Sequence, residues 1–138
     1  MAVIIRKGKL RLNMIQQQRR FSFPRSERLK YRSIIDQLFA EGTAINDFPV
    51  QVMYLYVPNA EHSAVQVGFA VPKRLIRKAA DRVKIKRLMR EAYRLQKAEI
   101  HQSIDRHAGL YLMFIYKAKT IPTYRVVEGK IKTIIERL

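Results

Sequence analysis

The spacing of apolar residues predicts a helix near the start of the chain. Between residues 26 and 42 the apolar side chains recur near helical spacing, at Leu29, Ile34, Ile35, Leu38 and Phe39. Ser26 is of a type that caps helix N-termini, and Gly42 is of the type that ends helices. This pattern predicts a first helix that starts after Ser26 and stops at Gly42.

Two segments after this helix have the composition and alternation of strands. Residues 49–57 are rich in β-branched and aromatic side chains, and Pro58-Asn59 follows them as a turn signal. Residues 63–71 alternate strictly, with one face made of Val65, Val67, Phe69 and Val71 and the other of Ala64, Gln66, Gly68 and Ala70. The two segments predict a β-hairpin, and residues 44–48 leave room for a short extra strand. The face of small residues leaves either a groove or a seat for a closely packed helix.

The stretch from Lys73 to Lys97 contains eleven Lys or Arg residues and only two acids, Asp81 and Glu91. After Pro72 and a short basic loop it has the spacing of a helix, with apolar positions at Ile85, Leu88, Met89, Ala92 and Leu95. Its cations recur at four-residue steps on another side, at Arg82, Lys86, Arg90 and Arg94. This segment predicts one long helix that contributes both to the core and to a charged surface.

Two further apolar segments complete the predicted fold. Residues 110–117 form a nearly continuous apolar run of the buried-strand type. Pro122 is placed to open a last helix, whose inward positions are predicted to be Val126, Val127, Ile131, Ile134 and Ile135. The order of elements is therefore α-β-β-α-β-α. A chain of 138 residues is long enough for one domain with a single core.

The charge of the chain points to a polyanionic partner. Lys and Arg number 28 against 11 acids, which gives a net charge of +17, while 48% of the residues remain hydrophobic. Such a field favours nucleic acid first, and an acidic membrane or protein surface second. The chain has no cysteine and no apolar run of the roughly 18 residues that span a bilayer, so we expect no disulfide, no Cys-ligated metal and no membrane insertion. The first 26 residues are basic without an acid; we favour a solvated arm, or an arm and a turn, in a cytoplasmic protein over the alternative of a cleaved targeting segment.

The sequence shows no residue grouping typical of a protein nuclease. Such an active site usually gathers carboxylates around divalent metals or places a His beside a phosphate. Here the acids are scattered, and the closest grouping is His101, Asp105 and His107 at the expected end of the long helix. We interpret these side chains as solvated or capping groups. A helix-turn-helix signature is also absent, which favours RNA over DNA as the partner.

One stretch of the basic helix resembles the signature of the bacterial ribonuclease P protein subunit. Residues 76–90, IRKAADRVKIKRLMR, match that signature, which reads apolar, two any, Ala, two any, Arg, Asn or His, any, apolar, basic, Arg, two any, Arg. The one departure is Val83 at the Asn position. The resemblance extends to the lead-in FSFPR at 21–25, to the first helix with Arg28, Leu29, Ile35, Phe39 and Gly42, and to residues 65–71 with Lys73-Arg74. Ile35 stands where family members carry a Phe.

The resemblance implies a fold and a division of the chain. It implies a single α/β (α+β) domain of the ribosomal protein S5 domain 2-like kind over residues 21–138, preceded by a basic arm at 1–20. The sheet would have about four strands with flanking helices, and a left-handed βαβ crossover would pass through the basic helix.

The resemblance also implies a function. The protein would be the subunit of ribonuclease P that binds the catalytic RNA and the 5′ leader of precursor tRNA, while the RNA, with Mg²⁺, performs the hydrolysis. The protein itself would bind no cofactor or metal and would be a monomer when free. The RNA-binding residues would be Lys73, Arg74, Arg82, Lys84, Lys86, Arg87, Arg90 and Arg94, and the leader groove would be lined by Ile35, Phe39, Tyr54 and Gln66.

Two alternatives remain open at the level of sequence. A general or ribosome-associated RNA-binding protein without a processing role would carry the same charge. A protein-only nuclease would need His101, Asp105 and His107 as its active site.

Overall fold

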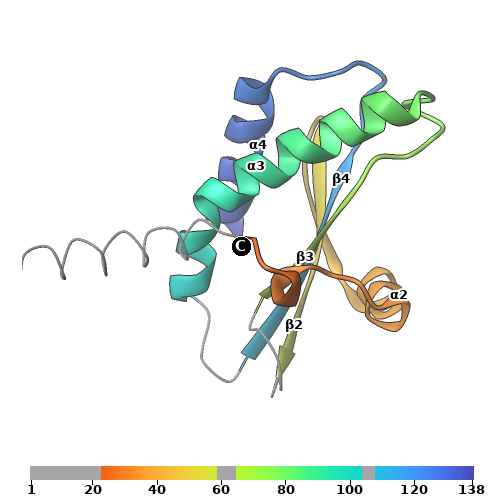
Figure 1. The fold of residues 1–138 in the computed structure, drawn as a ribbon. Helices are drawn as coiled ribbons and strands as arrows, with labels where there is room; N and C mark the ends of the chain where they lie inside the picture. Colours follow the sequence, from red (N-terminus) through yellow and green to blue (C-terminus); the bar gives the residue numbers. More distant parts are fainter. Residues whose placement is uncertain (1–22, 59–64, 104–107) are drawn as a thin grey trace, which may run out of the picture.

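The computed structural model describes residues 23–58, 65–103 and 108–138, which form three layers, with a four-stranded sheet between two layers of helices (Figure 1). The predicted short strand near residues 44–48 is present as the first strand. In chain order the elements are η1 (Arg25–Glu27), α2 (Arg32–Glu41), β1 (Thr43–Asp47), β2 (Val50–Pro58), β3 (Val65–Ala70), α3 (Ala79–Ser103), β4 (Ala108–Tyr116) and α4 (Tyr124–Arg137).

The strand order β1-β2-β4-β3 contradicts the predicted hairpin of β2 with β3. Strand β4 lies between them and pairs antiparallel with β2 and parallel with β3. The apolar run of β4 is buried on both faces of the sheet, so β4 takes a central place. Local alternation predicts that a segment is a strand but not which strand it pairs with, and this is why the hairpin prediction was wrong.

The two faces of the sheet are covered by different helices. Figure 1 shows α3 and α4 on one side and α2 on the other. The predicted division of β3 is confirmed, since Val65, Val67 and Phe69 face the α3–α4 core. Ala70 packs in the smaller cluster under α2. The small side chains of β3 therefore lie on the side of the sheet that α2 covers.

The first helix starts later than the sequence predicts. Ser26 lies within η1 and does not cap α2, which begins at Arg32 after Tyr31. The residues between η1 and α2 run along the edge of β3 instead, where the backbone N–H of Leu29 donates to the Val67 carbonyl at 2.9 Å. Backbone pairing with the sheet thus overrides the helical spacing. Gly42 does end α2 as its C-cap, and a Cβ there would clash with the Leu38 carbonyl oxygen.

The two long helices pack largely as predicted, with one exception in each. Ile85, Met89 and Ala92 of α3 are fully buried, but Leu95 is 44% exposed. In α4, Val126 is 43% exposed, while its four other predicted core residues are buried. Both exceptions lie at the margin of an apolar stripe that runs through the buried residues at three- and four-residue steps. No helix in the described ranges is both long and apolar enough to cross a bilayer.

Candidate nucleic-acid interface

The predicted cations lie in two places, on the loop before α3 and along α3 itself. Lys73 and Arg74 are exposed on a loop that runs to residue 78. Because α3 begins only at Ala79, the first six residues of the basic stretch 73–97 lie outside the helix. Lys84, Arg87 and Arg90 are exposed on α3 and form no ion pair with any other described residue. These three side chains are therefore available to phosphates.

Arg82 holds the loop against the helix. Its Nη1 donates to the carbonyl oxygens of Ile76 at 3.0 Å and Arg77 at 2.7 Å. Its guanidinium is a charge-assisted donor to two backbone acceptors, so it orders the approach of the basic loop to α3. The sequence predicted an RNA contact here, and the structure adds this positioning role.

Arg94 is already paired within α3. Its Nη2 lies 2.6 Å from Glu91 Oε1, and its Nε donates to Glu91 Oε2 at 3.1 Å. The hydrogen bond from Arg94 lowers the pKa of Glu91, so this carboxyl is ionised and neutralises its partner. Arg94 therefore adds less to the local positive potential than Lys84, Arg87 or Arg90 does.

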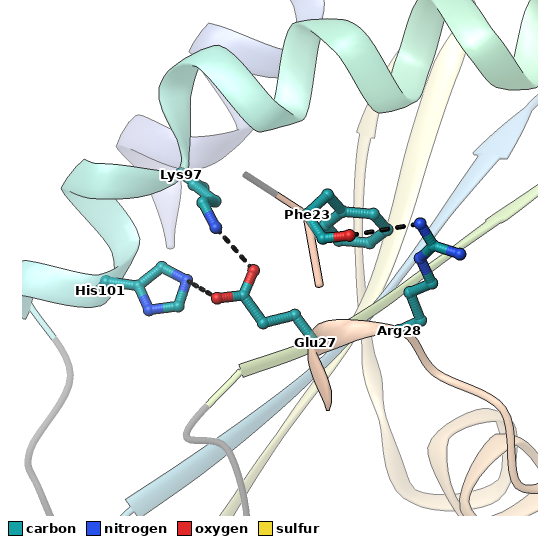
Figure 2. Close-up of polar contacts among 5 residues, drawn as sticks. All are labelled: Phe23, Glu27, Arg28, Lys97 and His101. Atoms are coloured by element: carbon teal, nitrogen blue, oxygen red, sulfur yellow. Dashed lines mark hydrogen bonds and ion pairs between the residues drawn. The ribbon is translucent and has the colours of Figure 1, made fainter. Parts of the chain in front are cut away.

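A buried ion pair fastens the segment before α2 to α3 (Figure 2). Lys97 Nζ lies 2.7 Å from Glu27 Oε2, and the two side chains are 4% and 12% exposed. His101 Nε2 lies 3.8 Å from Glu27 Oε1. We call Glu27, Lys97 and His101 the lead-in clamp. The sequence reasoning did not predict this clamp. Lys97 lies four residues after Tyr93 on the buried stripe of α3, and a lysine at a buried position needs a partner, so this placement was a signal.

The lead-in clamp borders a cationic cleft. Figure 2 shows Arg28 beside Phe23; the guanidinium carbon lies 5.5 Å from the ring centroid, and Nη2 donates to the Phe23 carbonyl at 3.3 Å. A cavity of about 290 Å³ opens between this segment, β3 and α3, and among its lining side chains are Phe23, Arg28, Lys30, Lys86 and Arg90. We call it the lead-in cleft. Its lining contains no acid, and cations beside aromatic rings suit single-stranded nucleic acid.

The predicted leader groove is only partly assembled by the fold. Ile35 packs in the cluster between α2 and the sheet, Phe39 is 49% exposed on α2, and Gln66 is on the same side in β3. Tyr54 was assigned wrongly, because it packs into the opposite core under α3 and α4. Alternation along β2 turns Met53 and Leu55, rather than Tyr54, toward α2.

Tyr111 is an aromatic residue on the α2 side of the sheet that the sequence reasoning did not name. It packs in the α2 cluster and pairs in register with Gln66 of β3. A strand that is buried on both faces has no alternation of polar and apolar residues. The sequence of β4 therefore did not indicate which face of the sheet Tyr111 is on. The Gln66 side chain is buried, and its Oε1 accepts no hydrogen bond from the described residues.

Metal-ligating residues do not gather in the described part of the chain. Over residues 23–58, 65–103 and 108–138, no three His, Asp or Glu side chains come together as a metal site. Asp105 and His107 lie outside the described residues, so the grouping with His101 stays a sequence-level observation. His101 itself is not a solvated end group, since it is partly enclosed beside Glu27.

The stability of the protein should fall as the pH drops below about 6.5, the ordinary pKa of histidine. Burial lowers the pKa of His101. The carboxylate of Glu27 raises this pKa and offsets part of the effect of burial, whereas the charge of Lys97 lowers it further. Below 6.5 the unfolded chain then binds more protons than the folded chain, so acid favours unfolding. The slope of unfolding free energy against pH is proportional to the difference in bound protons between the unfolded and the folded chain. His101→Gln should reduce this difference by up to about one proton, and the slope should become shallower accordingly. Urea unfolding at several pH values measures it, and an unchanged slope would contradict the assignment.

The sequence of this chain is similar to those of known proteins. The family model described as Ribonuclease P matches residues 23–138. A ribonuclease P protein component from Chlorobaculum tepidum is 32% identical, covering 91% of this chain and 88% of the relative. One from Porphyromonas gingivalis is also 32% identical, covering 86% and 87%.

Solved structures share the fold. The ribonuclease P protein of Thermotoga maritima superposes with a TM-score of 0.63 at 24% identity, covering 81% of this chain and 97% of the other. The protein from Staphylococcus aureus gives a TM-score of 0.64 at 20% identity, covering 80% and 94%. The α+β arrangement of one mixed sheet between helices is therefore that of these proteins.

Proposed function

The chain belongs to the ribonuclease P protein family and serves as the protein subunit of that tRNA-processing ribonucleoprotein, and we propose that its α3 surface binds the catalytic RNA. The observation that carries this proposal is a set of three exposed cations on one helix, Lys84, Arg87 and Arg90, that form no ion pair within the described part of the chain. Each can neutralise a phosphate and release counterions. Lys73 and Arg74 extend the same charge onto the loop before the helix.

The lead-in cleft extends the cationic surface of α3 to a second side of the helix. Arg90 lines this cleft together with Lys86 of the same helix and with Arg28. A phosphate backbone that crosses α3 would therefore meet cations on both sides of the helix. Because the lead-in clamp fixes Glu27, the neighbouring Arg28 is held in place before the RNA arrives. Such preorganisation lowers the entropic cost of binding.

We further propose that the 5′ leader of precursor tRNA lies along the α2 side of the sheet. Phe39 is exposed there, and Ile35, Gln66 and Tyr111 lie on the same face. Aromatic side chains can stack on unpaired bases with little sequence preference. The Oε1 of Gln66 is buried on this face and accepts no hydrogen bond from the described residues, so it is an acceptor that they leave unsatisfied.

The chemistry in this proposal belongs to the RNA. As a subunit of a ribonucleoprotein endoribonuclease, the protein would act by charge and position and would not itself cleave the substrate. Mg²⁺ would be held by RNA phosphates, and protein cations that draw the RNA and its substrate together would lower the Mg²⁺ concentration needed. Acting on bacterial precursor tRNA, the protein would work in the cytoplasm. Its net charge of +17 disfavours self-association, so we propose a monomer when free.

Reconstitution tests this function. At moderate Mg²⁺, the protein with its cognate ribonuclease P RNA should cleave precursor tRNA faster than the RNA alone, because the protein lowers repulsion between the two RNAs. The advantage should shrink as Mg²⁺ is raised. The control is a precursor with a leader of one nucleotide, on which the leader-dependent part of the effect should vanish.

Two outcomes separate the competing functions. Equal cleavage rates with and without the protein would refute the subunit role and favour a general RNA-binding protein. Cleavage by the protein without RNA, lost in His101→Gln, would favour a protein nuclease.

A further inference from the structure

A second hollow lies on the other side of α3, next to the start of α4. Its volume is about 680 Å³. Its lining includes four apolar or aromatic residues, Ala80, Val83, Leu88 and Tyr124, and the three cations that form no ion pair with any described residue, Lys84, Arg87 and Arg90. We call this hollow the Val83 niche. Arg90 lines both this niche and the lead-in cleft, so the two hollows flank the same basic ridge of α3.

Val83 is unusual at its position. It stands where the ribonuclease P signature has Asn or His, and its side chain is 46% exposed between Arg82 and Lys84. A single exposed Val is ordinary by itself. Here, however, Leu88, five residues later on α3, and the ring of Tyr124 line the same hollow and add to its apolar surface. An amide that could read a base edge by hydrogen bonds is thus replaced by a surface that favours a flat apolar ligand.

Tyr124 contributes a polar atom that lacks a partner. Its hydroxyl is enclosed and makes no hydrogen bond with any of the described residues. Burial, followed by the carboxylates of Glu128 and Glu91, raises the pKa of Tyr124, so the hydroxyl stays protonated and can donate. Enclosed polar groups without partners are rare in folded proteins, so this hydroxyl is a donor that the described residues leave unsatisfied.

The charged residues that line the niche are paired with each other on one part of its rim and are without such partners on the rest. Glu91 is the one acid in the lining, and both of its carboxylate oxygens are bonded by Arg94. Lys84, Arg87 and Arg90 carry no such partner among the described residues. The niche therefore combines an apolar floor with an uncompensated cationic rim, and a nucleotide presents the same two features, a flat base and a phosphate.

We propose that the Val83 niche holds one unstacked nucleobase of the partner RNA, with the adjoining phosphates on Lys84, Arg87 and Arg90. This inference rests on the proposed RNA-binding function of α3 and adds its ligand class and mode of contact. Because Val83 and Leu88 offer only van der Waals contact, the niche accepts any base by stacking and burial with little sequence preference.

Methyl NMR of the full chain tests the niche with a defined probe. Adenosine 5′-monophosphate should shift the methyl resonances of Val83 and Leu88 through the ring current of the base, whereas inorganic phosphate at equal concentration should leave them unchanged. Val83→Ala should weaken nucleotide binding several-fold and leave phosphate binding unaltered. Val126→Ala removes an equally exposed Val from α4 and is the matched control, with no expected change.

Equal methyl shifts from phosphate and from the nucleotide would overturn the proposal and leave only a charged patch. So would the absence of any shift with the nucleotide, or equal weakening by Val126→Ala.

Chemical probing of the assembled complex separates this inference from the function on which it rests. With wild-type protein or Val126→Ala, one unpaired base of the ribonuclease P RNA should be protected from modification, and with Val83→Ala it should become reactive. Normal stimulation of cleavage without any protected base that depends on Val83 would refute the niche alone. Loss of stimulation by the wild-type protein would refute the proposed function.

Discussion

Replacing Lys97 by Met should lower the free energy of unfolding by about 3 kcal/mol, because it leaves a buried carboxylate without its partner. The Lys97 and Glu27 side chains are 4% and 12% exposed, and their charged atoms lie 2.7 Å apart. The methionine fills most of the volume of the lysine stem, so packing changes little. Urea denaturation of the two proteins measures the difference.

The chain offers a matched control for this effect. Lys130 pairs with Asp47 at 3.2 Å, but its side chain is 38% exposed. Lys130→Met should therefore cost less than about 1 kcal/mol, since exposed ion pairs contribute little. Adding Glu27→Gln to Lys97→Met should recover part of the loss, because the buried charge is then removed as well. Equal losses in the two Lys→Met variants would show that the lead-in clamp contributes no more than a surface pair.

The lead-in clamp also connects stability with RNA binding. Glu27 is the residue before Arg28, and Arg28 and Lys30 form one wall of the lead-in cleft opposite Lys86 and Arg90 of α3. The ion pair thus holds two cationic walls at a fixed separation. Without the clamp, this segment would keep its backbone contact with β3 at Leu29 and the ring contact of Phe23 with Tyr93, but it would lose its ionic anchor on α3.

Replacing Lys84, Arg87 and Arg90 together by Ala should weaken binding of the ribonuclease P RNA on the order of 100-fold near 0.1 M salt. Each lost phosphate contact makes the slope of log affinity against log salt shallower by about 0.9, so three contacts change it by about two to three. The difference between the variant and the wild type should vanish near 1 M salt. Filter binding over a salt series measures both quantities.

The control for this variant loses the same charge elsewhere. Lys119, Lys132 and Arg137 are exposed on α4 or the loop before it, and their replacement by Ala lowers the net charge equally. If α3 is the interface, this control should retain most of the affinity and most of the salt slope. Equal losses in both variants would mean that the RNA responds to total charge and not to the surface of α3.

The sequence predicted the elements of this protein well because their signals are local. Spacing along the chain marked three strands and three helices, left room for the short strand that became β1, and put the small residues of β3 on one face. The motif at residues 76–90 indicated the family, since its charged and apolar positions are read directly from the chain. For the same reason the unpaired cations Lys84, Arg87 and Arg90 could be named before their geometry was known.

Contacts between residues distant in the sequence were decided by the tertiary structure alone. Strand β4 separates β2 from β3, and this order places Tyr111, rather than Tyr54, beside Gln66. Lys97 has the charge of a surface residue, yet it is buried against Glu27, which lies 70 residues earlier in the chain. Alternation and charge are properties of a segment, whereas strand pairing and burial depend on which segments the folded core brings together.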